Sequence, residues 1–172
     1  MNLRMNKIDN EYISIRIKSQ FGSKILNIEI LYDLLTITIE PNSNIEIVRW
    51  LATEKELQFT FLTDLTGIHY PDQKGQELGV IYHLHSFKNN IRLRLKLFID
   101  VKMPKVKSMT EVFGSANWME RETYDFFGVL FEGHPNLKRI LNMDEMDYFP
   151  LQKQYPLEDQ QREDKDDKFF GR

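Results

Sequence analysis

Apolar side chains recur with two different periods along the chain before residue 100, and each period predicts a different kind of element. Helical spacing occurs twice. In residues 8–21 a stripe through Tyr12 and Ile15 favours a helix over the alternative strand. In residues 45–55 the apolar side chains again fall on one face, and Asn44 can cap the helix.

Strand-like runs appear in the same region, and two pairs of them are close enough to form hairpins. Turn residues separate each pair: Tyr32-Asp33 in the first and Lys88-Asn89-Asn90 in the second, where asparagine tolerates positive φ. The strand-like runs are the two in residues 25–39 and those in residues 57–62, 78–87 and 91–99. The predicted order is therefore helix, two strands, helix and three strands.

Beyond Pro104 the pattern changes to helix start signals. Ser108 with Glu111, and Asn117 with Glu120, each place an acid three residues after a capping side chain. Pro135 is well placed as the first residue of a short helix over residues 136–141, NLKRIL. The chain is therefore predicted to be rich in short helices from this point.

These elements predict an α+β fold: a mixed or antiparallel sheet with helices packed on it, then short helices and an extended C-terminal arm. We expect an α+β domain over residues 1–107, a helical segment over 108–150 packed on the same domain, and an arm over 151–172. Residues 158–172 carry six acids and four bases, and no apolar residue precedes Phe169. Such a segment cannot form its own core, so it is either a solvated terminus or an arm that orders on a partner.

The chain has 172 residues, a net charge of −3 and no cysteine. One domain fits this length, and the acidic total gives no general case for nucleic acid. Without cysteine, disulfides, thiol nucleophiles and thiolate-bound zinc or iron–sulfur sites are excluded. The N-terminus lacks the apolar stretch of a secretory signal, and no apolar run is long enough to span a membrane. We expect a soluble chain whose contact with a membrane is indirect.

Two groups of residues on the second predicted hairpin could carry chemistry. His83 and His85 share one side of a strand, the spacing that some metal sites use, but a third ligand is needed and packed or surface histidines are commoner. Arg92, Arg94 and Lys96 form a basic strand face, which suits phosphates or an acidic partner as well as simple solvation. The acidic total and the lack of an aromatic stacking face beside these bases disfavour a nucleic-acid binder.

The densest pattern lies in residues 115–141, SANWMERETYDFFGVLFEGHPNLKRIL. Arg121 and Asp125 lie at i and i+4 of the predicted helix and can pair, and Glu120 serves as a cap. No nucleophile or metal ligand accompanies these charges, so an acid–base pair is disfavoured. Aromatic residues with arginines are typical of protein–protein anchors, and the segment therefore favours an interaction module.

The same segment resembles the signature of the C subunit of the proton-pumping NADH:quinone oxidoreductase, respiratory complex I, which is the 30-kDa subunit family. That pattern reads ERE, an aromatic residue, D, two apolar or aromatic residues, G, then GHP and L-K/R-RIL, and each element is present. FLTDLTGIHYPD, YHLHSF with RLRLKL, and FPLQKQYPLED resemble further family elements, so the resemblance covers about residues 5–160. Gln152 and Gln154 stand where the family usually has Arg and Asp, and His69 stands where Asp is common.

The resemblance implies a non-catalytic structural subunit of the peripheral arm that supports electron transfer from NADH to quinone. FMN and iron–sulfur clusters would lie in partner subunits, with none in this chain, and quinone would be reached only through the assembled complex. The partners would be other complex I subunits, especially D, B and I, on the cytoplasmic side of the bacterial inner membrane. The expected interface or scaffold positions are Glu120, Arg121, Glu122, Tyr124, Asp125, Gly128, Gly133, His134, Pro135, Arg139, Lys153, Tyr155 and Pro156.

Two alternatives remain open from the sequence. The equivalent subunit of a membrane-bound hydrogenase or of a ferredoxin-driven quinone reductase would share this module. A free-standing metal-binding hydrolase would instead use His83 and His85 as ligands.

Overall fold

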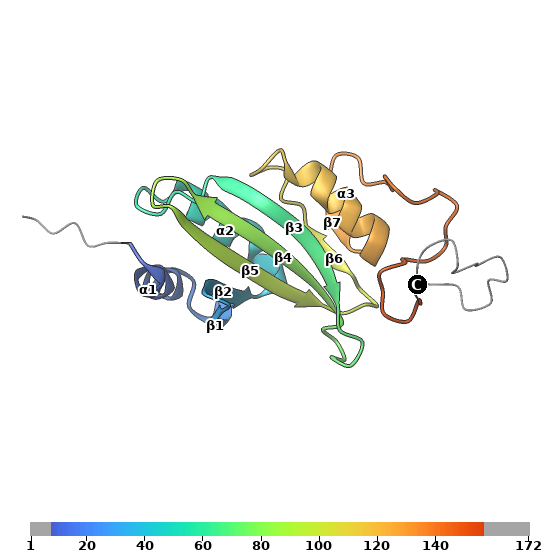
Figure 1. Cartoon of the computed structure of the whole chain (residues 1–172), viewed down its shortest axis with the longest axis horizontal. Coiled ribbons are helices and arrows are strands. Elements are labelled where there is room, and N and C mark those ends of the chain that lie inside the picture. The colour runs from blue at the N-terminus through green and yellow to red at the C-terminus, as the bar shows by residue number, and fades with distance from the viewer. Residues whose placement is uncertain (1–7, 157–172) are drawn as a thin grey trace, which may run out of the picture.

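The computed structural model describes residues 8–156, which form an α+β fold followed by a long irregular segment (Figure 1). The predicted arm beyond residue 156 lies outside the described residues. The helices are α1 (Asn10–Phe21), α2 (Asn44–Thr53) and α3 (Ala116–Phe127), and the strands are β1 (Ile25–Leu31), β2 (Leu34–Ile39), β3 (Phe61–His69), β4 (Leu78–Ser86), β5 (Ile91–Ile99), β6 (Lys105–Lys107) and β7 (Leu130–Glu132). The predicted fold class and the predicted order of the elements up to β5 are confirmed.

The main sheet is mixed, with the strand order β1-β2-β5-β4-β3. Neighbouring strands are antiparallel except for the parallel pair β2 and β5. Tyr32 and Asp33 have φ values of 51° and 61°, as a tight turn between twisted strands requires, and Asn90 in the second turn has φ 51°. Both predicted hairpins are therefore confirmed, with their turns at the predicted residues.

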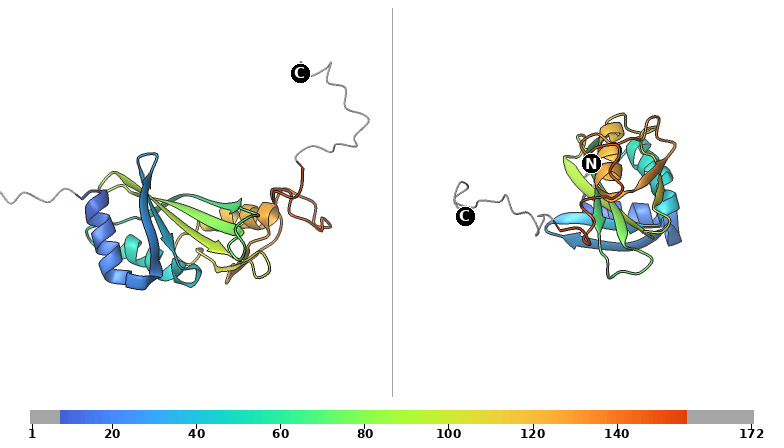
Figure 2. Two further views of the ribbon diagram at one scale, coloured as in Figure 1. Left: turned by 90° about the horizontal axis from the view of Figure 1, so that it is seen from below. Right: turned by 90° about the vertical axis from the view of Figure 1, so that its right-hand side faces the viewer.

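One face of this sheet and the buried sides of the helices enclose a single hydrophobic core. Alternation along β4 and β5 decides which side chains enter it, because successive side chains point to opposite faces. Tyr82, Leu84 and Leu95 are fully buried on the helical side. Helix α2 lies behind the strands in Figure 1 and forms a separate layer beside the sheet in Figure 2. Within the described range, the other face of the sheet carries no helix.

A second, two-stranded sheet ties down both ends of the α3 region. Strands β6 and β7 pair in parallel, with Val106 opposite Phe131, and both side chains are buried. The N–H of Leu130 donates to the carbonyl of Pro104 (2.6 Å). The N–H of Ser108 donates to the carbonyl of Glu132 (2.8 Å). The chain before α3 is therefore fixed to the chain after it.

The strand predicted over residues 57–62 begins later, as β3. Gln58 adopts positive φ (46°), and the N–H of Phe59 donates to the carbonyl of Leu51 (2.9 Å), so this stretch is a loop closing against α2. Phe59 is still buried in the core. The predicted bounds of this strand are therefore wrong, because a short apolar run does not distinguish strand from loop.

Two predicted helices are absent. The residues after Ser108 form turns: its hydroxyl donates to Glu120 (2.6 Å) and accepts from the N–H of Thr110 (3.2 Å), but no helix follows. Residues 136–141 form no helix either. The N–H groups of residues 140–142 donate to the carboxylate of Asp125 and cannot serve an internal helical ladder.

The predicted cap of α2 is also wrong in detail. Ser43 occupies the N-cap position without a side-chain cap bond, and Asn44 is the first helical residue. The buried amide of Asn44 donates to the carbonyl of Lys107 (2.8 Å) and to the hydroxyl of Tyr82 (3.3 Å). It therefore joins α2 to β6 and β4 across the core.

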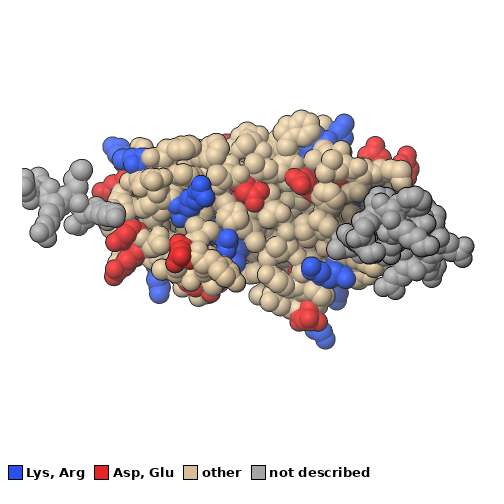
Figure 3. Space-filling model, in the orientation of Figure 1, with Lys and Arg blue, Asp and Glu red and all other residues tan. Residues whose placement is uncertain are grey.

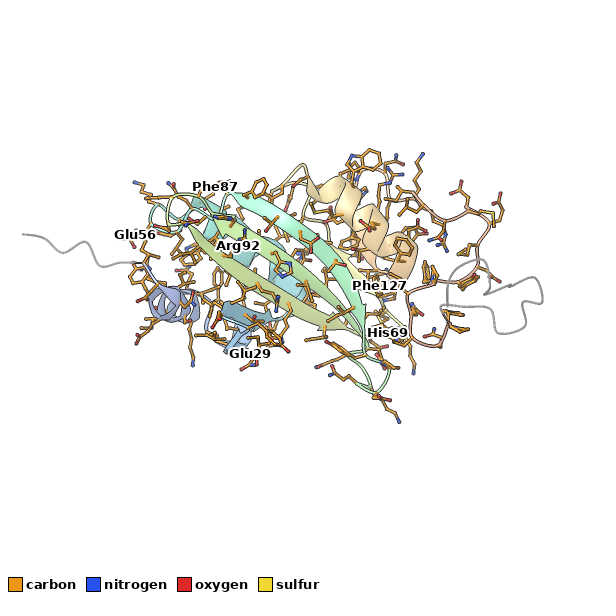
Figure 4. All side chains as sticks on the ribbon, viewed as in Figure 1. Glu29, Glu56, His69, Phe87, Arg92 and Phe127 are labelled. Carbon is orange, nitrogen blue, oxygen red and sulfur yellow. The ribbon has the colours of Figure 1, made fainter. Side chains whose placement is uncertain are left out.

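Helix α3 packs directly on β3 at Gly67, and this contact fixes the position of the helix on the sheet. A Cβ atom at this residue would lie 2.5 Å from a ring carbon of Phe127 and 3.0 Å from a methyl of Thr123. Only the absence of a side chain lets the helix approach so closely. Phe127 and His69, labelled in Figure 4, mark the junction of α3 with the end of β3.

We expect Gly67→Ala to lower the free energy of unfolding by about 1–3 kcal/mol, because the added methyl must displace the Phe127 ring. Urea denaturation measures the loss. Gly114→Ala is the matched control, because nothing lies within 4 Å of a Cβ there. The double variant Gly67→Ala with Phe127→Ala should show a smaller loss than the sum of the two single losses, and strict additivity would contradict the proposed contact.

Candidate interaction site

Four charged signature residues lie on α3, and three of them face inward. Glu120 and Asp125 are 0% exposed and Arg121 is 7% exposed, whereas Glu122 points to solvent. The helix ends at Gly128, which adopts φ 83° and donates its N–H to the carbonyl of Tyr124 (2.9 Å). Isolated buried charges are costly, so each of these groups must find partners inside the chain.

Asp125 finds its partners in the irregular segment that follows β7, residues 134–156. One carboxylate oxygen accepts from the backbone N–H groups of Ile140 (3.1 Å), Leu141 (2.8 Å) and Asn142 (3.0 Å). The other accepts from Arg139 Nη1 (2.9 Å) and from the side-chain amide of Asn142 (3.1 Å). The carboxylate thus takes the place of the backbone carbonyls that would accept from these three N–H groups in a helix or a sheet.

Burial by itself would raise the pKa of Asp125. The N–H groups of Asn142 and Leu141 and the side chains of Arg139 and Asn142 outweigh burial and hold the pKa well below its usual 3.8. A lowered pKa in the folded state stabilises the fold above the unfolded-state pKa, and this contribution is lost as the pH falls below it. Asp125 is therefore charged throughout the neutral range.

Arg139 extends the same network along the 134–156 segment. Its Nη1 donates to both the carbonyl and the carboxylate of Asp125, while Nη2 donates to the carbonyls of Met146 (2.8 Å) and Tyr148 (2.9 Å). The guanidinium also lies over the ring of Phe149, 4.9 Å from its centroid. We call this set of contacts between Asp125 and Arg139 the brace.

Arg121 does not pair with Asp125, and the predicted i to i+4 ion pair is wrong. Its Nε and Nη2 donate instead to the carbonyls of Lys138 (3.1 Å) and Arg139 (3.2 Å), so it holds the same segment from its other side. Asp125 pairs instead with Arg139, whose guanidinium donates to four acceptors at once, two of them on Asp125 itself. The guanidinium of Arg121 also lies 4.7 Å from the ring centroid of Trp118.

Glu120 does not cap α3, which contradicts the second start signal. Its carboxyl accepts from the hydroxyl of Ser108 (2.6 Å) and from the N–H of Met109, so it fastens the turn after β6 to the helix. Within the described residues no cation forms an ion pair with it. Burial raises its pKa from the usual 4.5 to about 7, against the lowering effect of the two hydrogen bonds.

The GHP sequence forms the turn from β7 into the 134–156 segment. Gly133 has φ 87°, and Pro135 is exposed in the turn. His134 Nδ1 accepts from the N–H of Asn136 (3.0 Å), so the proton resides on Nε2, which donates to the carbonyl of Asn117 (3.0 Å). The imidazole therefore joins this turn to the start of α3.

The end of the described chain returns to α3 and β3. Gln152 is buried and donates to the carbonyl of Phe127 (2.7 Å), and the N–H of Lys153 donates to His69 Nδ1 (2.9 Å). Gln152 also accepts from the amide of Gln154 (2.7 Å). The residues that depart from the family pattern thus meet in space, where neutral hydrogen bonds hold the segment.

Aromatic rings complete this packing. Phe149 covers Gly128, where a Cβ would lie 2.6 Å from its ring, and makes an edge contact with Tyr124 at 5.9 Å between centroids. Tyr155 packs against Tyr148 at 4.9 Å, while Lys153 and Pro156 are exposed. Phe149, Gln152 and His69 were not predicted as site residues. Their contacts come from distant parts of the chain. The sequence marked Gln152 and His69 only as departures from the family pattern, and it gave no signal for Phe149.

The exposed side chains of α3 and of the braced segment are a mixture of charged and apolar groups. Large side chains that normally avoid water are exposed by 38–69% here, and they come from α3 and from the segment. The exposed set, which we call the α3 surface, is Trp118, Leu141, Met143, Tyr148 and Leu151. Exposed aromatic and aliphatic side chains on a rigid support are typical of protein-binding sites.

The histidines proposed as alternative metal ligands lie elsewhere, on the helix-free face of the sheet. His83 Nε2 accepts from Arg94 Nε (2.9 Å), and its Nδ1 lies 3.4 Å from Asp64. His85 stacks on Phe87 at 4.7 Å between ring centroids. Among residues 8–156 no group of three or more His, Cys, Asp or Glu residues could hold a metal ion.

A mixed sheet with helices on one face, and a buried charged brace beside exposed apolar side chains, define an α+β domain. The family described as Respiratory-chain NADH dehydrogenase, 30 Kd subunit, matches residues 37–161, and this chain belongs to that family. The resemblance drawn from the signature is therefore confirmed.

Relatives in this family differ in length. The chain is 43% identical over 129 residues to the C subunit of NADH-quinone oxidoreductase from Mesorhizobium japonicum, covering 75% of this chain and 63% of the relative. It is 36% identical to the corresponding protein of Geobacter sulfurreducens, covering 90% and 94%. A solved trypsin-resistant fragment of Nqo5 superposes with a TM-score of 0.61 at 29% identity, covering 74% and 98%. The chain thus spans less than two thirds of some relatives and nearly all of others.

We expect Asp125→Asn to lower the free energy of unfolding by about 3 kcal/mol, because Arg139 loses its buried counter-ion and an amide can replace only part of the carboxylate's acceptor capacity. Limited proteolysis should then cut within residues 140–156. Glu122→Gln, on the exposed side of the same helix, is the control and should change neither. Equal unfolding free energies for the two variants would contradict the role of the brace.

Glu120 should give the opposite dependence on pH. Its pKa is raised from 4.5 to about 7, so its contribution to stability is full below pH 4.5 and is lost as the pH rises through 7. Relative to Glu120→Gln, the wild type should lose up to about 3 kcal/mol between these limits. Urea denaturation of both proteins at a series of pH values measures the difference in their free energies of unfolding. A difference that is constant with pH would contradict the raised pKa of Glu120.

Proposed function

We propose that this chain is a non-catalytic structural subunit of the peripheral arm of a proton-translocating NADH:quinone oxidoreductase, where it supports electron transfer from NADH to quinone. One observation carries the proposal. The buried charged residues of the signature are engaged by contacts within the chain, and those contacts hold the segment that carries exposed apolar side chains. A scaffold with a docking surface needs this arrangement, and an acid–base catalyst does not.

The geometry gives no positive support to catalysis at the signature. Asp125 has its carboxylate filled by donors, and Glu120 accepts from a hydroxyl and an N–H. A general base must reach the proton that it removes, and neither of these fully buried groups is open to a substrate in this arrangement. We assign both residues to the support of the surface.

Cofactors belong to partner subunits in this proposal. A chain without cysteine cannot offer the thiolates that usually hold iron–sulfur clusters, so electrons would pass between FMN and clusters held elsewhere. We propose that the D, B and I subunits of the complex are the neighbours and that quinone is reached only through the assembled complex. No helix within residues 8–156 is long and apolar enough to cross a membrane. We place the chain on the cytoplasmic side of the bacterial inner membrane, held there by its partners.

The α3 surface is the proposed site of docking for another subunit. Trp118 is 65% exposed, and the guanidinium of Arg121 beneath it is fixed by two carbonyls, so the ring is ordered before a partner arrives. Pre-ordered aromatic side chains lose little entropy on binding, and tryptophan is enriched among the residues that dominate interface energies. Leu141 and Met143 extend the apolar area along the segment.

The alternatives have less support. The relatives described above are named as subunits of NADH-quinone oxidoreductase, which favours that complex over a hydrogenase or a ferredoxin-driven reductase. A hydrolase built on His83 and His85 would require His83 to give up its hydrogen bond from Arg94 and would require a third ligand.

We expect Trp118→Ala to reduce the amount of assembled complex on a native gel about tenfold, because a loss of about 1–2 kcal/mol at an interface anchor weakens binding by that order. The melting temperature of the isolated chain should stay within about 2 °C of the wild type, since the side chain is mostly exposed. Ile15→Ala on α1 removes another exposed apolar side chain (62%) and is the control. An unchanged level of complex for Trp118→Ala would refute the assignment of this surface.

A further inference from the structure

The face of the sheet without helices has an unusual composition. Figure 1 looks onto this face, and Figure 3 shows that its centre is largely uncharged, with a few separate basic and acidic side chains. The strand register brings together arginines, histidines, aromatic rings and isoleucines from β3, β4 and β5. A purely solvated sheet face normally carries polar side chains, so the apolar content calls for a partner.

A row of hydrogen-bonded groups crosses the middle of this face. Asp64 lies opposite His83, and His83 lies opposite Arg94 in the register. His83 Nε2 accepts from Arg94 Nε (2.9 Å), so its proton resides on Nδ1, which faces Asp64 Oδ2 at 3.4 Å. The Nε side of the guanidinium is therefore fixed by a neutral imidazole. Within residues 8–156, its two terminal nitrogens have no acceptor and no carboxylate as partner.

Two neighbouring bases on β5 complete the charge pattern. Lys96 pairs with Glu29 on β1 (2.9 Å) and is neutralised. Arg92, labelled in Figure 4, is exposed, and no carboxylate among residues 8–156 lies within ion-pair distance of it. Arg92 and Arg94 are two residues apart on one side of a strand, a separation of roughly 7 Å. The face thus presents two arginines at a fixed spacing with spare capacity for carboxylates.

Apolar groups lie on both sides of these arginines. At one end, Phe61 packs on Phe87 with ring centroids 5.3 Å apart, and they are 44% and 66% exposed. At the other end, Ile68 and Phe98 close over Gly79, where a Cβ would lie 2.7 Å and 3.0 Å from their side chains. Aromatic rings beside arginines are the composition of interface cores.

We propose that this face, named here the β surface, binds an acidic segment of a partner protein whose carboxylates pair with Arg92 and Arg94 and whose apolar side chains cover the flanking rings. The β surface lies on the opposite side of the sheet from the core and does not include the α3 surface. The proposal therefore does not depend on the docking role of Trp118.

The apolar surroundings favour a protein over a nucleic acid here. A protein segment can cover the flanking aromatic and aliphatic side chains with its own apolar side chains, and two arginines form too small a basic patch to follow a phosphate backbone. A planar guanidinium held by Nε can still form a two-point contact with a carboxylate through its terminal nitrogens. Two such residues at strand spacing fit carboxylates on alternate residues of an extended segment.

The test uses the full chain assembled in the membranes of its source cells. A photo-crosslinking amino acid is placed at Ile81, at the centre of the β surface, and in a parallel strain at Trp118. Mass spectrometry then identifies the peptide joined to each position. We expect Ile81 to join a peptide that carries Asp or Glu beside apolar residues.

Charge reversal then establishes specificity. Arg94→Glu should lower the yield of this crosslink about tenfold, since like charges at an interface cost on the order of 1–2 kcal/mol or more. Replacing the partner's carboxylate with arginine in the same strain should restore the yield. Lys18→Glu, an exposed reversal on α1, is the control and should leave the yield unchanged. If isolated Arg94→Glu melts below the wild type, Arg92→Glu replaces it, because Arg92 is exposed and makes no described ion pair.

Three results would overturn the proposal: no crosslink from Ile81 while Trp118 gives one, a crosslinked peptide without acidic residues, or a crosslinked product removed by ribonuclease. The reverse result, a crosslink from Ile81 with none from Trp118, would support the β surface and count against the docking role of the α3 surface. The two proposals can therefore fail separately.

Discussion

A fully buried carboxylate must find its donors within the chain, and the position of Asp125 makes this requirement decisive for the last part of the described structure. The carboxylate accepts from three successive backbone N–H groups and from a guanidinium that itself reaches two further carbonyls. Residues 134–156 form neither helix nor strand, so these contacts satisfy backbone groups that a ladder would otherwise satisfy. The ion pair of Asp125 with Arg139 is therefore central to the contacts that hold the segment.

The buried charged residues of α3 hold two different stretches of the chain. Arg121 and Asp125 hold the segment after the helix, while Glu120 holds the turn before it, and the parallel pair β6–β7 joins these two stretches of chain. The helix is in turn fixed to the sheet at Gly67. Apolar side chains of the α3 surface thus rest on a support connected to the core at several points, which is why they can remain exposed and ordered together. Membership of the 30-kDa subunit family is consistent with such a support.

The sheet could be predicted from the sequence because its signals are local. Alternation along β5 and the turn residues Tyr32, Asp33 and Asn90 each specify their element within a few positions. The brace could not be predicted in the same way. Rules for helical neighbours pointed from Asp125 to Arg121, whereas its counter-ion lies 14 residues away in a segment without periodicity. The signature marked the residues that form the brace, but only the three-dimensional contacts show which of them are buried and which are exposed.

The parallel pairing of β2 with β5 has a consequence for how this protein is made. The first hairpin is complete at Ile39, yet the strand that pairs with its inner edge begins only at Ile91. A ribosome must add helix α2, β3 and β4 before that edge can be covered, so the early hairpin emerges with an open side rich in leucine and isoleucine. Contacts of such long sequence separation slow folding and leave apolar edges open to wrong partners. A nascent chain that has reached β4 therefore still has an uncovered edge on β2, well before the brace can form.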